Sequence, residues 1–154
     1  MKSSGVKDSK VSVLSSSVDW VRLAADRDAI ESKLNGLEFT DKGLRRICFH
    51  EKGEPGLQVM LIESLPNCSF PNHYHTHDES IIVLRGSLRI IFQDMDRGRA
   101  EVALDANNFC GNFYLIPTGA IHATFAGPSG CIYMEIKYLK GLCEPATIFG
   151  DHNG

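Results

Sequence analysis

The fold is decided by the stretch Asn72-His73-Tyr74-His75-Thr76-His77-Asp78-Glu79. Side chains alternate between the two faces of a β-strand. If the stretch begins as a strand, His73 and His75 point the same way, and their imidazoles can converge on one ion. Glu79 then follows a short loop and opens the apolar run 80–84, so its carboxylate can reach the same point.

A further ligand lies far along the chain, in the segment 111–122, where Pro117 and Gly119 predict a turn and His122 begins the next apolar run. Three neutral imidazoles and one carboxylate suit a borderline divalent ion such as Fe, Mn, Ni, Co or Zn. An ion that prefers six ligands would keep open positions, which catalysis or substrate chelation needs. We therefore predict one divalent transition metal, held by His73, His75, Glu79 and His122.

Around these residues the chain alternates between short apolar runs and turn-forming residues. The runs, rich in Val, Ile, Leu, Phe and Tyr, are 47–51, 57–63, 80–84, 88–93, 101–104, 113–116, 121–125 and 131–138. They are separated by Gly, Pro, Asn and Asp, for example at Arg85-Gly86 and at Gly127-Pro128-Ser129-Gly130. Many short strands at this spacing indicate an all-β barrel or sandwich.

The N-terminal part has a different pattern. Residues 1–16 are rich in Ser and Lys, which predicts a flexible N-terminal arm. From Ser17 to Leu34 the apolar spacing is helical, and Asn35-Gly36 can end the helix. We expect the helix to pack outside the main body. The predicted boundaries are an arm at 1–16, a helix and linker at 17–44, the barrel at 45–140 and a C-terminal tail at 141–154.

Composition excludes some partners. A net charge of -3 offers no bulk attraction to nucleic acid, and no apolar run is long enough to cross a bilayer. The serines and the second lysine near the start interrupt any secretory signal, so we expect a cytoplasmic protein. The five cysteines form no Cys-x-x-Cys pair, which favours reduced thiols packed as small hydrophobic groups.

The two histidine segments resemble the two cupin motifs. The first motif is Gly, five residues, His-x-His, three or four residues, Glu, six residues, Gly; the second is Gly, five residues, Pro-x-Gly, two residues, His, three residues, Asn. The matching residues are His73, His75, Glu79 and Gly86 in the first, and Gly111, Pro117, Gly119 and His122 in the second. Asn67 replaces the first Gly, and Ala126 replaces the final Asn. The resemblance implies a single cupin barrel (a double-stranded β-helix, or jelly roll) that binds a metal through the four predicted ligands. His77 is the additional histidine, and we expect it to be exposed or to lie behind the ligands.

The region from about Arg45 to Lys137 also resembles the WbuC-type cupin metalloproteins, through Arg45-Arg46-Ile47-Cys48-Phe49-His50 and Met134-Glu135-Ile136-Lys137. Such proteins are often encoded with enzymes of surface polysaccharide or nucleotide-sugar synthesis, so the resemblance implies a sugar or nucleotide-sugar ligand.

Two further pairs are candidates for a role in the site. Glu135 and Lys137 share one strand face: inside the barrel they would form a catalytic pair, and on the solvated face a surface salt bridge. Arg46 and His50 are candidates for binding a phosphate or carboxylate of the substrate, the alternative being a surface arginine and a packed histidine.

Three functions remain open at this stage. The first is a metal-dependent isomerase or epimerase of a sugar, the second an Fe(II) oxygenase, and the third a binding or sensor module without turnover. We also expect a homodimer, because the segment Val11-Ser12-Val13-Leu14 can add to a sheet edge of a second copy.

Overall fold

The computed structural model describes residues 12–13, 27–50, 55–94, 98–139 and 148–149. One helix, α2 (Arg27–Asn35), accompanies nine strands in this part of the chain. The strands are β1 (Ser12–Val13), β2 (Leu44–Cys48), β3 (Gly56–Ser64), β4 (Ser69–Tyr74), β5 (Glu79–Asp94), β6 (Gly98–Asp105), β7 (Phe113–Ile116), β8 (His122–Leu139) and β9 (Ile148–Phe149). The predicted all-β class is confirmed, and the strands form a jelly roll.

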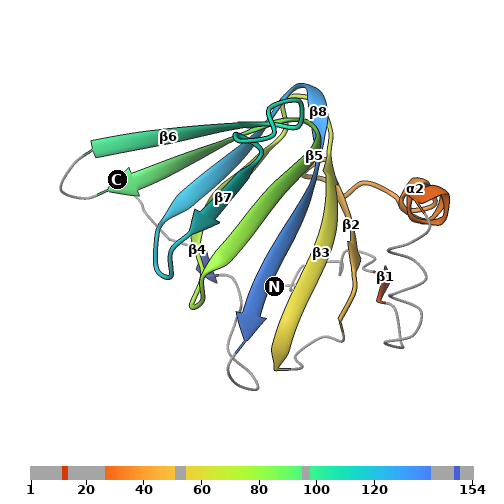
Figure 1. Cartoon of the computed structure of the whole chain (residues 1–154), viewed down its shortest axis with the longest axis horizontal. Helices are drawn as coiled ribbons and strands as arrows, with labels where there is room; N and C mark the ends of the chain where they lie inside the picture. Colours follow the sequence, from red (N-terminus) through yellow and green to blue (C-terminus); the bar gives the residue numbers. More distant parts are fainter. Residues whose placement is uncertain (1–11, 14–26, 51–54, 95–97, 140–147, 150–154) are drawn as a thin grey trace, which may run out of the picture.

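The two long strands β5 and β8 run through both halves of the jelly roll (Figure 1). The second half of β8 pairs with β3 and with the first half of β5, and these strands extend to β2 and β7. The first half of β8 pairs with β4 and with the second half of β5, which also pairs with β6. These pairings bring the end of β4, the beginning of β8 and parts of β5 close together, although they are far apart in the sequence.

Each long strand passes from one half to the other beside a glycine. The β5–β8 register shifts around Gly86, whose φ is 73°. A β-carbon at Gly86 would lie 2.1 Å from the carbonyl oxygen of Gly130, so only glycine fits this crossing. The runs 80–84 and 88–93 were predicted as two strands, and so were 121–125 and 131–138. In the structure each pair is one strand with an irregularity, because the glycines bend the strand without ending it.

The main core lies between the two halves and includes the fully buried Ile81, Val83, Leu88 and Ile90. A second cluster lies on the outer face of β2 and β3, where Leu34 of α2 packs against Ile47 and Leu61 (Figure 1). The helix thus packs outside the barrel, as predicted. Burial on both faces explains why five consecutive residues of β3, 58–62, are buried.

The structure describes only some of the residues for which we predicted features near the ends of the chain. The predicted helix began at Ser17, and the structure describes it from Arg27, so residues 17–26 lie outside the described part. The segment expected to add to a second copy pairs, as β1, with β2 of its own chain. The homodimer therefore stays a prediction. No helix in the described ranges is long and apolar enough to cross a membrane.

Candidate metal centre

Three buried histidines converge where β4 ends and β8 begins. His73 is paired with His122 across the two strands, and His75 follows β4 directly. The ring centroids of His73 lie 4.9 Å from His75 and 4.2 Å from His122. One nitrogen from each ring lies within 4.8 Å of the other two. The sequence prediction that these three imidazoles face one point is confirmed, and their spacing suits a single ion.

Backbone carbonyls orient two of the rings for coordination. His73 Nδ1 donates to the carbonyl oxygen of Pro71 at 2.8 Å, and His122 Nδ1 donates to that of Ala120 at 2.9 Å. Each Nε2 then carries the lone pair that a metal needs, an arrangement common to metal-binding histidines. Nε2 of His122 is buried and has no hydrogen-bond partner in the described structure. Because a buried polar atom without a partner is costly, this donor set fits a divalent ion.

The environment also keeps these rings neutral. Burial, aided by the charge of His122, lowers the pKa of His73 from 6.5 to about 4. Burial likewise lowers the pKa of His122. Since only the neutral imidazole offers a lone pair, both side chains are ready to coordinate at neutral pH.

A hydrogen-bonded clasp joins the two histidine loops, and the sequence analysis missed it. One carboxylate oxygen of Asp78 accepts from both the backbone N–H and the hydroxyl of Thr118, each at 2.8 Å. The backbone N–H of Gly119 donates to the carbonyl oxygen of His75 at 2.9 Å. The loop before β5 is therefore tied to the loop before His122. Asp78 and Thr118 are 40 residues apart in the chain, so local sequence patterns give no signal for this contact.

Glu79, the predicted fourth ligand, opens β5 and is buried beside the histidines. Its Oε2 lies 2.6 Å from Nε2 of His75 and 3.0 Å from Nζ of Lys137. The group of mutually close ligand atoms contains the three histidines without Glu79. Coordination by Glu79 therefore stays a prediction.

Lys137 and Glu135 lie inside the barrel, which decides between the two alternatives for this pair. Lys137 is 2% exposed and ion-pairs with Glu135 at 2.5 Å as well as with Glu79. Its Nζ also donates to Nδ1 of His75 at 3.2 Å. In the register of the sheet Lys137 stands opposite Glu79, which is why the two meet. One ammonium thus links two carboxylates and a histidine in a site shielded from water.

The charges of this cluster shift its three pKa values. Burial alone would raise the pKa of Glu79, but the hydrogen bond from His75 and the charge of Lys137 lower it to about 2. Burial raises the pKa of Glu135, and the negative charge of Glu79 raises it further. For Lys137, burial would lower the pKa, but the two carboxylates raise it. Lys137 is therefore charged, Glu79 is ionised, and Glu135 holds a proton more readily than an exposed glutamate.

The remaining predicted residues lie apart from the histidines. Arg46 is exposed, while Nδ1 of His50 lies 3.1 Å from the carbonyl oxygen and 3.2 Å from the nitrogen of Val59. In the described part of the chain, no hydrogen bond or ion pair joins Arg46 or His50 to the three histidines, so their role in binding substrate stays a prediction. His77 is buried, and its Nε2 lies 2.9 Å from the hydroxyl of Thr76.

Apolar residues form the wall beside the histidines. Ile81, Val83 and Ile116 are fully buried in the core. Sequence reasoning missed Phe92, which stands opposite His122 in the register, with ring centroids 5.9 Å apart. The Phe92 ring also lies 5.7 Å from that of Tyr114. These aromatic rings make one side of the centre apolar.

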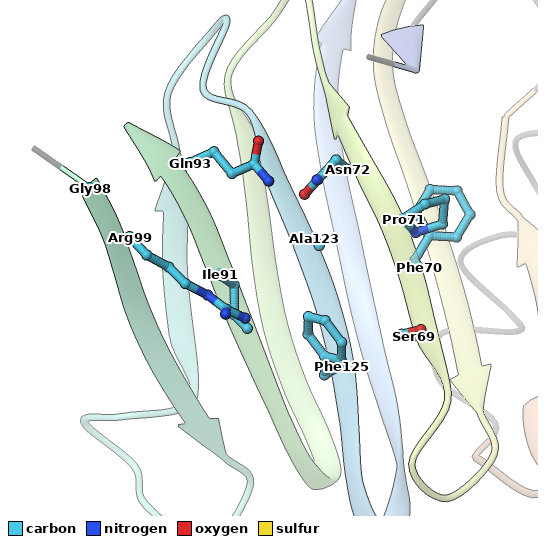
Figure 2. A pocket seen from close by; sticks show the side chains of 10 residues that line it. All are labelled: Ser69, Phe70, Pro71, Asn72, Ile91, Gln93, Gly98, Arg99, Ala123 and Phe125. Atoms are coloured by element: carbon cyan, nitrogen blue, oxygen red, sulfur yellow. The ribbon is translucent and has the colours of Figure 1, made fainter. Parts of the chain in front are cut away.

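A separate groove of about 510 Å³ lies on the outer face of the sheet (Figure 2). Its floor contains Ile91 and Ala123, the chain neighbours of Phe92 and His122. Because side chains alternate between faces, this groove and the histidines are on opposite sides of the same strands. The groove is therefore not the metal centre.

Solved structures with similar folds were found among oxalate-processing proteins. An oxalate decarboxylase variant from Bacillus subtilis aligns with a TM-score of 0.58 at 18% identity, over 72% of this chain and 29% of the other. Oxalate oxidase bound to the substrate analogue glycolate aligns with a TM-score of 0.58 at 18% identity, over 71% of this chain and 56% of the other. At this identity the likeness shows the fold alone, and the chain spans about a third to a half of these proteins. No curated protein sequence matches the chain.

A protein-family model shows to which family the chain belongs. The model of the ChrR cupin-like domain matches residues 29–138, which include all three converging histidines. The predicted cupin superfamily is thus confirmed, while the narrower likeness to WbuC-type proteins stays a prediction. With its buried histidine triad, the chain is a metal-binding cupin and belongs to the ChrR cupin-like domain family.

Proposed function

We propose that the chain is a divalent-metal-dependent enzyme that isomerises or epimerises a small sugar or nucleotide sugar. The observation that carries this proposal is the largely buried Glu135–Lys137 pair beside His75. Buried charges are expensive, and a cluster of them in contact with a metal ligand is typical of sites that move protons.

In the proposed reaction the ion polarises the substrate, and side chains of the protein move the proton. When bound by the histidines, a divalent ion would supply Lewis-acid polarisation of a carbonyl or of paired hydroxyls. Glu135 would take a proton from the carbon beside that carbonyl and, in an isomerisation, return it to the neighbouring carbon on the same face; in an epimerisation, water would supply the proton to the opposite face. Its raised pKa makes it a better base than an exposed carboxylate. Lys137 would stay charged and hold Glu135 in one position through the ion pair.

A small carboxylate is the second candidate substrate. Two observations favour it: the positive charge of Lys137 inside the site, and the names of the similar folds, which concern oxalate and glycolate. An ammonium and a divalent ion together attract a carboxylate more strongly than they attract a neutral sugar.

Proton exchange tests the first proposal. The metal-loaded protein would be incubated in D₂O with sugars and nucleotide sugars, and deuterium incorporation at carbon followed by NMR. We expect incorporation by the wild type and a loss of at least about 100-fold in Glu135→Gln, since general-base catalysis contributes about that much. The matched control Glu101→Gln removes an exposed carboxylate paired with Arg89 and should keep wild-type exchange.

A second set of assays distinguishes the two candidate substrate classes from each other and from a binding module without turnover. Oxalate and glycolate would be offered under air, with product formation and oxygen uptake recorded. Turnover here without sugar exchange would favour the carboxylate candidate, and oxygen uptake would favour an oxygenase. Binding of either class without any product would contradict the enzymatic proposal and favour a binding module.

A further inference from the structure

The groove on the outer face of the sheet has the features of a second ligand site. Its volume of about 510 Å³ falls within the usual range of small-molecule sites, roughly 300–1,000 Å³. Strands β4, β5, β6 and β8 all contribute side chains to it (Figure 2). The histidines lie on the other face of the same strands, so a molecule in the groove would not contact a bound metal ion.

The floor of the groove is apolar and shielded from water. Ile91 is 5% exposed and Ala123 is 7% exposed, although both lie on the outer face, where they are cross-strand partners. The side chain of Ala123 is small, which leaves room between its larger neighbours. The ring of Phe125, two residues further along β8, stands beside this space (Figure 2). An aromatic ring and aliphatic groups on one surface favour a planar apolar ligand.

Three polar side chains surround this floor. Arg99 extends from β6 beside Ile91 (Figure 2). Asn72 of β4 and Gln93 of β5 extend toward each other across β8 (Figure 2). Within the described ranges, none of these three side chains forms a hydrogen bond or an ion pair. One guanidinium and two amides can therefore give their hydrogen bonds to a ligand.

The charge at the groove favours an anion. Arg99 lines the groove, and no acidic residue of the described chain does so. Glu101 stands opposite Ile91 on β6, but its carboxylate pairs with Arg89 at 3.4 Å, so its charge is offset. A planar guanidinium binds a carboxylate through two parallel hydrogen bonds. One guanidinium without a counter-ion matches a ligand that has a single negative charge.

We propose that this groove binds a planar aromatic monocarboxylate, at a site separate from the metal centre. The rings of the ligand lie on the apolar floor beside Phe125, and its carboxylate pairs with Arg99. The amide of Gln93, which is opposite Arg99 in the register, donates to the same carboxylate. The inference goes beyond the proposed function, because no residue of the groove takes part in the proposed reaction.

Calorimetric titration with naphthoate, a two-ring monocarboxylate, tests the inference. The metal-free protein is used, so that no ion competes for the carboxylate. We expect the wild type to bind naphthoate and Arg99→Gln to bind it at least about tenfold more weakly, since a charge-assisted pair is lost. Naphthamide, the neutral analogue, should also bind the wild type at least about tenfold more weakly. The matched control Arg85→Gln removes an exposed arginine that pairs with Glu63, and it should keep the wild-type affinity.

A second variant and a map of the bound ligand locate the site. Ala123→Leu fills the floor of the groove and should abolish binding, while circular dichroism verifies that the variant is folded. NMR chemical shifts of the wild type, recorded with and without naphthoate, should change at the outer-face residues of β5, β6 and β8. If Ala123→Leu does not fold, these shifts still decide, because changes confined to the inner face of the barrel would overturn the proposal.

Three further outcomes would overturn the inference. The first is a wild type that does not bind naphthoate, or binds it no better than Arg99→Gln does. The second is binding that survives in Arg99→Gln and is lost in Lys137→Met, which would place the carboxylate inside the barrel. The third is a dimer, seen by light scattering, that Ala123→Leu separates, because the groove would then be a contact between copies. All three leave the enzymatic proposal standing, since proton exchange at carbon tests it independently.

Discussion

Acid should destabilise the metal-free protein through His73, and the size of the effect follows from its burial. The side chain is 5% exposed, and its pKa falls from 6.5 to about 4 in the folded state. Between these values the unfolded chain binds a proton that the folded chain does not. Stability therefore rises with pH across this window and is lost as the pH falls. At 1.36 kcal/mol per pKa unit, lowering the pH from 7 to 4.5 should remove about 2–3 kcal/mol through His73.

Comparison with a variant isolates this contribution from the other titrating groups. Glu135, with its raised pKa, acts in the opposite direction, so the wild type alone is not sufficient. The assay is urea denaturation of metal-free wild type and His73→Gln, which cannot titrate, at pH 7 and at pH 4.5. We expect the wild type to lose about 2–3 kcal/mol more than the variant over this interval. Equal losses in both proteins would refute the conclusion that burial keeps His73 neutral.

Three further changes probe the clasp, the crossing and the core. Asp78→Ala breaks both hydrogen bonds to Thr118, so Zn²⁺ affinity in a dye competition should fall by about 10-fold; unchanged affinity would mean that the clasp does not position the ligands. Gly86→Ala places a β-carbon against Gly130 at a positive φ, and it should lower the melting temperature more than Ala103→Gly does in exposed β6; a neutral effect would contradict the close crossing. Ile90→Ala empties a fully buried position and should destabilise the protein by about 2–5 kcal/mol in urea denaturation, whereas a loss under about 1 kcal/mol would contradict its place in the core.

Short-range sequence patterns predicted the histidine triad. The alternation of side chains placed His73 and His75 on one face, and the turn at Pro117 and Gly119 placed His122 at the start of a strand, as observed. The motif position at Asn67 has a φ of 59°, which is consistent with the expected glycine. Each of these features depends on local geometry, which residue type and spacing determine.

Features that depend on long-range register could not be predicted. Lys137 is 62 residues from His75, and the two meet only because β8 pairs with β5 so that Lys137 is opposite Glu79. Sequence alone did not decide whether the Glu135–Lys137 pair lies inside the barrel or on its solvated face. Gly86 and Gly130 were interpreted as ends of strands, because a glycine in a turn and a glycine at a close crossing look alike in sequence.

The central claim is that His73, His75 and His122 bind one divalent ion, and elemental analysis of the purified protein tests it most directly. The wild type and a His75→Ala, His122→Ala double variant would be loaded in parallel, freed of loose metal and analysed. The account predicts about one equivalent of a transition metal in the wild type and none in the double variant. No metal in the wild type after reconstitution, or equal amounts in both proteins, would contradict it.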